Sequence, residues 1–257
     1  MMSQNTSSIE RVASWLADAR HAVIFTGAGI STESGIPDFR SPGGVWSKNR
    51  PVYYDEFLAS AEARFEYWRQ KAEAAADFER AEPNAGHLVI ARWEQIGRIA
   101  AVITQNIDGL HQQAGSHRVF ELHGTARWIK CVDCEERFQP MPLIEAFRAN
   151  QAVPPCPACG GRLKSATISF GQGMPADVMK ESTRLAEASD LFLAIGSSLV
   201  VHPAAGLPEL ARRAGAKLVI INRDPTDQDS GAAAAIREPI GKVLTQIDAA
   251  ISQSAHS

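Results

Sequence analysis

Early in its length the chain reads Ala22-Val23-Ile24-Phe25-Thr26-Gly27-Ala28-Gly29-Ile30-Ser31, and this segment decides the fold class. Its first five residues form a continuous apolar run, which is typical of a strand buried on both faces of a parallel sheet. Glycines at 27 and 29 let the backbone turn tightly and approach a pyrophosphate, whose charge suits the N–H groups of a following helix. The segment therefore predicts the first strand and phosphate-binding turn of a Rossmann-type domain.

The turn departs from the usual dinucleotide fingerprint. Thr32 stands where a third glycine is expected, and the next glycine is Gly35. The chain also lacks an obvious second strand that ends in an acidic residue about 20 positions later. A purely structural turn and a nicotinamide-dependent oxidoreductase both remain open at this point.

Further apolar runs are spaced along the chain and alternate with helical patterns. We expect strands at 99–104, 166–170, 191–195 and 217–221, and helices at 55–76, 84–93, 176–188 and 239–251. Strands that alternate with helices favour an α/β fold. The prediction is a Rossmann-type, doubly wound parallel sheet.

Polar residues follow three of these strands. Gln105-Asn106-Ile107-Asp108 follows one, Gly196-Ser197-Ser198 another and Asn222-Arg223 a third. In open α/β sheets ligands bind at the carboxyl ends of the strands, so these groups are candidate ligand-binding residues. Asn222 can bond a ribose hydroxyl, whereas Arg223 could meet a 2′-phosphate, so this stretch alone leaves NADP open.

The cysteines fall into two Cys-x-x-Cys pairs, Cys131 with Cys134 and Cys156 with Cys159, separated by 21 residues. Four thiolates at this spacing fit tetrahedral Zn²⁺ and leave no coordination position for water. We predict one structural zinc ion.

A zinc-ribbon interaction or nucleic-acid module without catalysis is the alternative from another class of protein. The formal charge is -3, and no cluster of Lys and Arg interleaves with aromatic residues, so no direct nucleic-acid partner is expected.

Composition sets broad limits. With 257 residues, 45% apolar and 21% charged, the chain fits one sizeable domain with an elaboration. No apolar run reaches the roughly 20 residues that span a bilayer, and residues 1–8 lack the features of a signal peptide. We expect a cytoplasmic protein without a membrane partner; the oligomeric state is open.

With these residues in place, the chain resembles the sirtuin family of NAD-dependent protein deacylases, of the bacterial type. The resemblance covers nearly the whole chain and rests on an ordered set of motifs. These are Gly27-Ala28-Gly29-Ile30-Ser31, Gly35-Ile36-Pro37-Asp38-Phe39-Arg40, Thr104-Gln105-Asn106-Ile107-Asp108-Gly109-Leu110-His111, His123-Gly124, the four cysteines, Phe170-Gly171 and Gly196-Ser197-Ser198-Leu199.

The resemblance implies a Rossmann-type sheet with a small zinc-binding module and a helical insertion. Residues 1–39, 82–125 and 166–257 would form the NAD-binding domain, residues 40–81 the cofactor loop and helical insertion, and residues 126–165 the zinc-binding module. NAD and an acyl-lysine protein or peptide would meet in the cleft between them.

It also implies the site residues. NAD would be bound by Gly27, Ala28, Gly29, Ser31, Asp38, Phe39, Arg40, Gln105, Asn106, Ile107, Asp108, His123, Gly196, Ser197, Ser198, Asn222 and Arg223. Asn106 and Asp108 would line the pocket for the nicotinamide end, and Asn106 and His123 would be catalytic. The acyl oxygen would attack the ribose carbon as nicotinamide leaves. His123 would then remove a proton from a ribose hydroxyl, a task that suits a pKa near neutrality.

The substrate would add a strand between Phe170-Gly171-Gln172 and Leu199-Val200-Val201, with Ile107 also in contact. Main-chain hydrogen bonds would then dominate recognition. The products would be free lysine, nicotinamide and O-acyl-ADP-ribose. The same cofactor cleavage could feed ADP-ribosyl transfer to protein, which is a neighbouring alternative.

Some residues depart from the family pattern. Gln172 replaces a frequent glutamate, and Ser165-Ala166 replaces a proline-containing lead-in, so we expect an effect on substrate preference rather than on catalysis. Desuccinylase-type members carry Tyr and Arg three residues apart, and the nearest equivalents here look like Trp68 and Lys71, whereas Tyr67 is followed three residues later by Gln70. Because lysine lacks the bidentate fork of arginine, we predict neutral acyl groups over succinyl.

Overall fold

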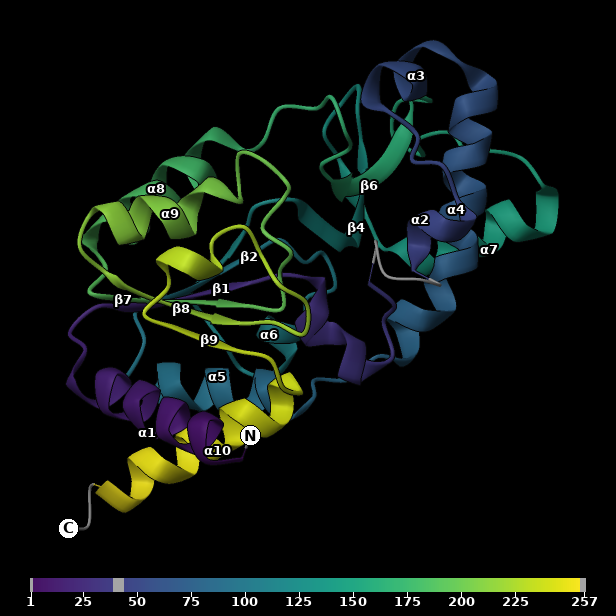
Figure 1. The fold of residues 1–257 in the computed structure, drawn as a ribbon. Helices are drawn as coiled ribbons and strands as arrows, with labels where there is room; N and C mark the ends of the chain where they lie inside the picture. The colour runs from purple at the N-terminus through teal and green to yellow at the C-terminus, as the bar shows by residue number, and fades with distance from the viewer. Residues whose placement is uncertain (1, 39–43, 255–257) are drawn as a thin grey trace.

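The computed structural model describes residues 2–38 and 44–254, so Phe39 and Arg40 lie outside the described residues (Figure 1). Within that part, six strands form one parallel sheet in the order β3-β2-β1-β7-β8-β9. Their bounds are β1 Ala22–Thr26, β2 Ala101–Thr104, β3 Val119–Glu121, β7 Leu191–Ile195, β8 Lys217–Ile221 and β9 Ala234–Ile236. The strand order runs outward in opposite directions from β1 and β7, so the predicted doubly wound sheet is confirmed.

Helices cover both faces of this sheet (Figure 1). On one face α1 (Met2–Asp18), α5 (Ala85–Gln95) and α10 (Ile240–Ser254) pack on side chains such as Ile24 and Val102. On the other face α8 (Ala176–Ala188) and α9 (Gly206–Arg213) pack on Phe25 and Ile103. Successive strand residues point to opposite faces, so a continuous apolar run supplies both cores.

A small domain stands beyond the carboxyl ends of the strands (Figure 1). It holds an antiparallel sheet in the order β5-β4-β6, with β4 Gly124–Cys131, β5 Arg137–Phe138 and β6 Leu163–Thr167, and the helix α7 Pro140–Asn150. The segment before α5 contributes α2 (Val45–Lys48), α3 (Tyr54–Ala59) and α4 (Ala61–Arg80). Trp68 of α4 shares a buried core with Ile129, Phe147 and Leu163.

The strand predicted at 166–170 is wrong. The observed strand is β6, which begins at Leu163 and pairs with β4 in the small sheet, with Cys131 opposite Leu163. The indole N–H of Trp68 donates to the Leu163 carbonyl at 3.0 Å. Apolar patterning identifies a strand without naming its sheet, and here the partner strand and a distant helix decide the register.

Two short elements differ from expectation near the sheet's carboxyl edge. The glycine-rich turn leads into a 3₁₀ helix, η1 (Ala28–Ser34), rather than an α-helix. The edge strand β3 is only three half-buried residues long, too short to stand out in the sequence. The remaining elements are α6 (Leu110–Gln113) and η2 (Asp229–Gly231).

Among the helices that the structure describes, none is both long and apolar enough to cross a membrane.

Candidate active site

A cavity of about 1530 Å³ runs between the parallel sheet and the small domain. It collects residues that follow the ends of β1, β2, β7 and β8, as expected for this sheet class. The predicted site residues that line it are Ala28, Gly29, Asp38, Gln105, Asn106, Ile107, Asp108, His123, Phe170, Gly171, Gln172, Gly196, Ser197, Ser198, Val201, Asn222 and Arg223. The fold thus brings together side chains that lie up to about two hundred positions apart in the sequence.

Four other predicted residues do not line the cavity: Gly27, Ser31, Leu199 and Val200. Leu199 packs into the core beneath α9, with its backbone at φ +55°, while Val200 is 52% exposed. Ser31 is buried one layer below the wall.

The glycine-rich turn crosses the backbone at the end of β7. The N–H of Gly29 donates to the Gly196 carbonyl at 2.8 Å, and a Cβ on Gly29 would stand 2.7 Å from the Gly196 Cα. Gly196 itself has φ +66°, and a Cβ there would lie 2.5 Å from the Ile30 nitrogen. These glycines therefore serve the packing of two loops as well as the cavity wall, so the turn has a structural role beside any role in binding.

Hydrogen bonds fix the loop after β2. The Asn106 amide Nδ2 donates to the Ser31 hydroxyl at 3.0 Å, and that hydroxyl donates to Asp108 Oδ2 at 2.7 Å. The other Asp108 oxygen accepts the N–H of Leu110 at 2.9 Å. Burial raises the pKa of Asp108, although the bonds from Leu110 and Ser31 oppose that rise. Ser31 thus connects η1 to the loop of residues 105–108 through hydrogen bonds to Asn106 and Asp108.

His123 lies where the chain passes from β3 to β4. Its Nδ1 is 2.9 Å from the Gln105 carbonyl. Because a carbonyl oxygen only accepts, Nδ1 carries the hydrogen and the neutral ring keeps its lone pair on Nε2. The next residue, Gly124, has φ +67°, and a Cβ there would lie 2.2 Å from the Ala166 carbonyl oxygen. The His-Gly pair therefore combines an oriented base with a strand crossing that only glycine permits.

The cavity wall near β7 and β8 presents further polar groups. The Ser197 hydroxyl donates to Gln105 Oε1 at 2.7 Å and accepts the N–H of Leu199 at 3.2 Å. The guanidinium of Arg223 pairs with Asp224 at 2.9 Å. A 2′-phosphate would have to compete with that carboxylate, so the NADP alternative gains no support from this geometry.

Around the predicted peptide site, aromatic residues from two segments meet. The ring of Phe170 lies 5.7 Å from that of Tyr53, and the N–H of Tyr54 donates to the Phe170 carbonyl at 2.9 Å. The side-chain oxygen of Gln172 accepts the N–H of Ser169 at 3.1 Å. The amide that replaces the frequent glutamate therefore bonds its own loop.

The assignment of Trp68 to the acyl end of the cavity is wrong. Trp68 is fully buried against Phe147 and does not line the cavity, whereas Tyr67, Gln70 and Lys71 do. Residues 67 and 71 share one helix face because they are four positions apart, and residue 68 points about 100° away. The prediction identified the right helix and is wrong for Trp68, whereas Lys71 does line the cavity.

Tyr67 and Lys71 give this end of the cavity its chemistry. The Tyr67 hydroxyl accepts the N–H of Ser165 at 3.2 Å. Burial lowers the pKa of Lys71 to about 8. Its helical neighbours at three and four positions, Trp68, Ala74, Ala75 and Tyr67, carry no carboxylate. The pKa of Lys71 is therefore about 8, well below its ordinary value of 10.5, so the side chain loses its charge more readily than an exposed lysine.

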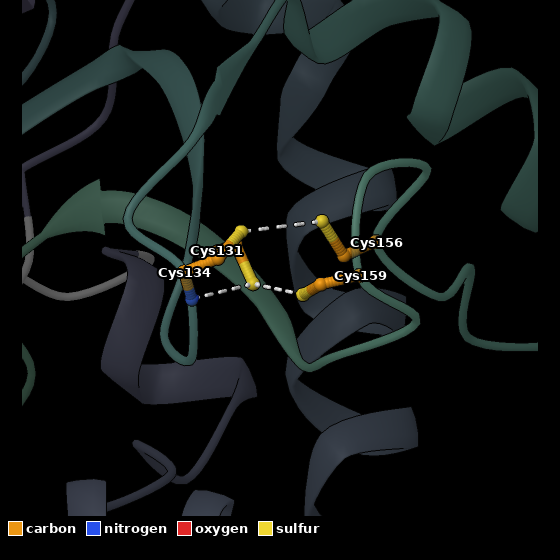
Figure 2. Close-up of side chains that lie close together, drawn as sticks. All are labelled: Cys131, Cys134, Cys156 and Cys159. Carbon is orange, nitrogen blue, oxygen red and sulfur yellow. Dashed lines mark hydrogen bonds between the residues drawn. The ribbon is translucent and has the colours of Figure 1, made fainter.

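The four cysteines meet in the small domain, where two loops face each other (Figure 2). All four Sγ atoms lie within 4.8 Å of one another, with 3.6 Å between Cys131 and Cys159 and 3.8 Å between Cys134 and Cys156. These separations are far longer than an S–S bond, and they match the edge of about 3.8 Å that a tetrahedron with Zn–S bonds of about 2.3 Å requires.

Backbone N–H groups support the same cluster. Asp133 and Cys134 donate to Cys131 Sγ at 3.4 and 3.5 Å, and Gly161 donates to Cys159 Sγ at 3.4 Å. Such bonds stabilise thiolates over thiols. The predicted structural zinc site is confirmed, and its four sulfur ligands leave no position for a reacting group.

Comparison with known proteins agrees with this geometry. A family model described as the Sir2 family matches residues 27–203. An NAD-dependent protein deacetylase of Rhodopseudomonas palustris is 51% identical over 241 residues, which cover 93% of this chain and 95% of the relative. An NAD-dependent protein deacylase 2 of Archaeoglobus fulgidus is 42% identical over 240 residues, covering 93% of this chain and 94% of the relative.

Solved structures match as well. One, from work on the mechanism and regulation of Sir2 enzymes, has a TM-score of 0.87 at 40% identity and covers 96% of this chain and 99% of that one. A Sir2 complex with a p53 peptide and NAD+ has a TM-score of 0.87 at 36% identity, covering 97% of this chain and 99% of that one.

Proposed function

This chain belongs to the Sir2, or sirtuin, family, and from that premise we propose how its own residues divide the work of deacylation. The protein is an NAD-dependent protein-lysine deacylase that transfers the acyl group to ADP-ribose and releases nicotinamide. NAD is its co-substrate, and one structural zinc ion supports the fold. The observation that carries the assignment is the convergence of Gln105, Asn106, Asp108 and His123 on one cavity, apart from the closed zinc site.

We assign the NAD side of the cavity to the ends of the parallel strands. Backbone groups at Ala28 and Gly29 would meet the phosphates, Ser197 and Gln105 would hold the adjoining ribose, and Asn222 the other ribose. Asp38, Phe39 and Arg40 would complete the cofactor loop. The bond between Ser197 and Gln105 supports this assignment, because it fixes both side chains before NAD enters.

We assign the chemistry to Asn106, Asp108 and His123. Asn106 and Asp108 would hold the nicotinamide end, with Ile107 between them touching both substrates. His123 would take a proton from a ribose hydroxyl through Nε2. The bond from its Nδ1 to the Gln105 carbonyl supports this role, because it orients the ring and fixes the tautomer.

The proposed division of the chain follows the same lines. Residues 1–39, 82–125 and 166–257 would bind NAD, while residues 40–81 and 126–165 would close the cleft over the acyl-lysine. The core that Trp68 shares with Ile129 and Leu163 supports joint movement of the last two segments.

The substrate would be an acyl-lysine protein or peptide, bound in extended form between residues 170–172 and 199–201. A Sir2 enzyme solved with an acetylated peptide supports this substrate class. The exposed side chains of Phe170 and Val200 lie on these segments, where a peptide would cover them. No direct nucleic-acid or membrane partner is proposed, and the cytoplasm is the proposed compartment.

We further propose that neutral acyl groups are preferred over succinyl. Lys71 offers a single ammonium instead of a guanidinium fork, and its pKa of about 8 weakens that charge further as the pH rises. A Sir2 enzyme has been solved with a propionylated peptide, which carries a neutral acyl group.

Comparing turnover of acetyl-, butyryl- and succinyl-lysine peptides at saturating NAD tests this preference. We expect the two neutral peptides to react faster than the succinyl peptide at pH 7, and the gap to widen at pH 9 as Lys71 loses its charge. Fastest removal of succinyl at both pH values contradicts the proposal.

A further inference from the structure

A chain of buried polar groups runs behind the proposed nicotinamide pocket. The Thr26 hydroxyl donates to the Thr104 hydroxyl at 2.8 Å and lies 2.9 Å from His111 Nε2. The Thr104 hydroxyl also accepts the backbone N–H of Asn106 at 3.0 Å. Thr26 and Thr104 are paired residues at the ends of β1 and β2. Thr26, Thr104 and His111 are all at least 98% buried, and none lines the cavity.

A second buried histidine packs against this chain. The ring of His87 lies edge-on to that of His111, with centroids 4.9 Å apart. The N–H of Asn84, which caps α5, points at His87 Nδ1 at 3.4 Å. His87 Nδ1 is therefore the acceptor nitrogen, and Nε2 carries the hydrogen.

The hydrogen bonds also fix which ring nitrogen of His111 carries the hydrogen. Since the Thr26 hydroxyl donates to Thr104, its oxygen accepts from His111, so His111 carries its hydrogen on Nε2 and keeps a lone pair on Nδ1. His87 Nε2 and His111 Nδ1 have no hydrogen-bond partner in the described part of the chain. The two rings are in edge-on contact without a hydrogen bond between them, so the hydrogen-bonded chain runs from His111 through Thr26 to Thr104.

Both rings are neutral in this position. Burial lowers the pKa of His87 to about 4 and that of His111 well below its ordinary value, with the neighbouring His87 adding to the effect on His111. A neutral ring keeps one donor and one acceptor nitrogen, so His111 can donate to Thr26 and His87 can accept from Asn84.

We propose that His111 and Thr26 are positioning residues that fix the backbone of Asn106 for cleavage of the nicotinamide–ribose bond. The proposal rests on the function proposed above for Asn106. The Thr104 hydroxyl receives two hydrogens, from Thr26 and from Asn106, and this pair of bonds sets its rotamer. Ser31 holds the Asn106 side chain from a different side. Backbone and side chain of Asn106 are thus fixed separately, and loss of the backbone restraint would misplace the amide.

Replacing Thr26 tests the chain with little change of shape. Thr26→Val removes the hydroxyl and keeps the branched side chain, whereas Thr26→Ser keeps the hydroxyl. We expect Thr26→Val to lower the kcat of exchange with labelled nicotinamide roughly 10-fold or more, since small misplacements of reacting groups cost up to about 10²-fold. The KM for NAD should change little, and Thr26→Ser should retain most of the rate. Ser182→Ala, a fully buried hydroxyl on α8, is the matched control and should leave exchange unchanged.

His111→Phe allows a second test, in which single and double variants are compared. If the residues act as one chain, the double variant Thr26→Val/His111→Phe should be no slower than the slower single variant. Should Thr26→Val fail to fold, His111→Gln against His111→Phe gives the same comparison, because the glutamine amide can still donate to Thr26.

Three results would overturn the proposal: exchange in folded Thr26→Val within twofold of the native rate, equal losses in the Val and Ser variants, or additive losses in the double variant. Asn106→Ala in the same assay separates failure of the role proposed for Asn106 from failure of the positioning role proposed for His111 and Thr26. If that variant retains exchange, the role proposed for Asn106 fails; if it alone loses exchange, only the positioning chain fails.

Discussion

At the scale of single residues, His123 is the side chain whose surroundings most fully support its proposed role. Its ring is tied through Nδ1 to the Gln105 carbonyl and lines the cavity beside Asn106. That bond places the hydrogen on Nδ1 and leaves Nε2 as the basic nitrogen. The neighbouring Gly124 has the positive φ that the turn into β4 requires. The motif His123-Gly124 is therefore explained by two separate physical needs.

Substituting His123 separates proton transfer from binding. We expect His123→Ala to lower the rate of deacylation by about 10²–10⁴-fold, the usual contribution of a general base. NAD affinity, measured by calorimetry, should stay within a few-fold of the native value. His117→Ala, at an exposed histidine, is the control. Deacylation at the native rate in His123→Ala would exclude the proposed role.

Lys71 makes a prediction about stability and pH. Its pKa is about 8 in the folded protein and 10.5 ordinarily, so between these values the unfolded chain binds more protons, and stability rises with pH. The free-energy cost of burying the charged Lys71 side chain is fully present below about pH 8. Lys71→Met should therefore stabilise the protein at pH 7 by at most about 3 kcal/mol, an upper bound because the side chain lines a cavity that is open to solvent.

Urea unfolding of Lys71→Met and the native protein at pH 7 and pH 10 measures this effect. The gain should shrink at the higher pH, and Lys180→Met, at an exposed lysine on α8, should show no gain at either. A Lys71→Met protein that is less stable than the native one at pH 7 contradicts the assignment.

At the scale of elements, local chemistry was predictable and long-range pairing was not. The glycine turn and the polar strand ends could be read locally, because each reflects a backbone or ligand need within a few residues. The strand at 163–167 was misplaced because its sheet is chosen by β4 and by Trp68, 95 positions earlier. Trp68 and Tyr67 were confused because a one-residue step on α4 changes the face, and sequence alone does not show which face meets the cavity.

The crossing of η1 and the end of β7 gives a prediction at this scale. Gly29→Ala would place a methyl group 2.7 Å from the Gly196 Cα, where only backbone atoms stand and none can rotate away. We expect a loss of about 1–3 kcal/mol in stability, the usual cost of overpacking, together with weaker NAD binding.

Gly173→Ala is the matched control, because a Cβ there meets no atom within 4 Å. Denaturant unfolding and NAD titration of the two variants decide the matter. If Gly29→Ala behaves like Gly173→Ala in both measurements, the close backbone contact has no energetic importance.

At the scale of the whole molecule, the zinc site and the cavity are linked through the core of the small domain. Cys131 and Cys156 pack in the same cluster as Trp68 and Phe147, which lie behind the cavity wall formed by Tyr67 and Lys71. The two cores of the parallel sheet are separate from this cluster. The domain arrangement was foreseeable only through the family resemblance; the shared core was not, because its members come from distant segments.

Removing zinc should therefore act on one part of the molecule. Cys156→Ser should lose the metal and loosen the small domain, because binding energy at a structural zinc site is folding energy. Metal content and a thermal melt measure this; we expect an added transition at lower temperature, with weaker peptide binding and a retained transition for the parallel sheet. Native metal content with an unchanged melt would show that the cysteines play no such role.

The most direct test of the proposed reaction is the stoichiometry of products from NAD and an acetyl-lysine peptide, measured by mass spectrometry. We predict one nicotinamide and one O-acetyl-ADP-ribose for each lysine freed, and no product when NAD is withheld. Formation of NADH, attachment of ADP-ribose to the peptide without loss of its acetyl group, or lysine release without NAD would contradict that reaction.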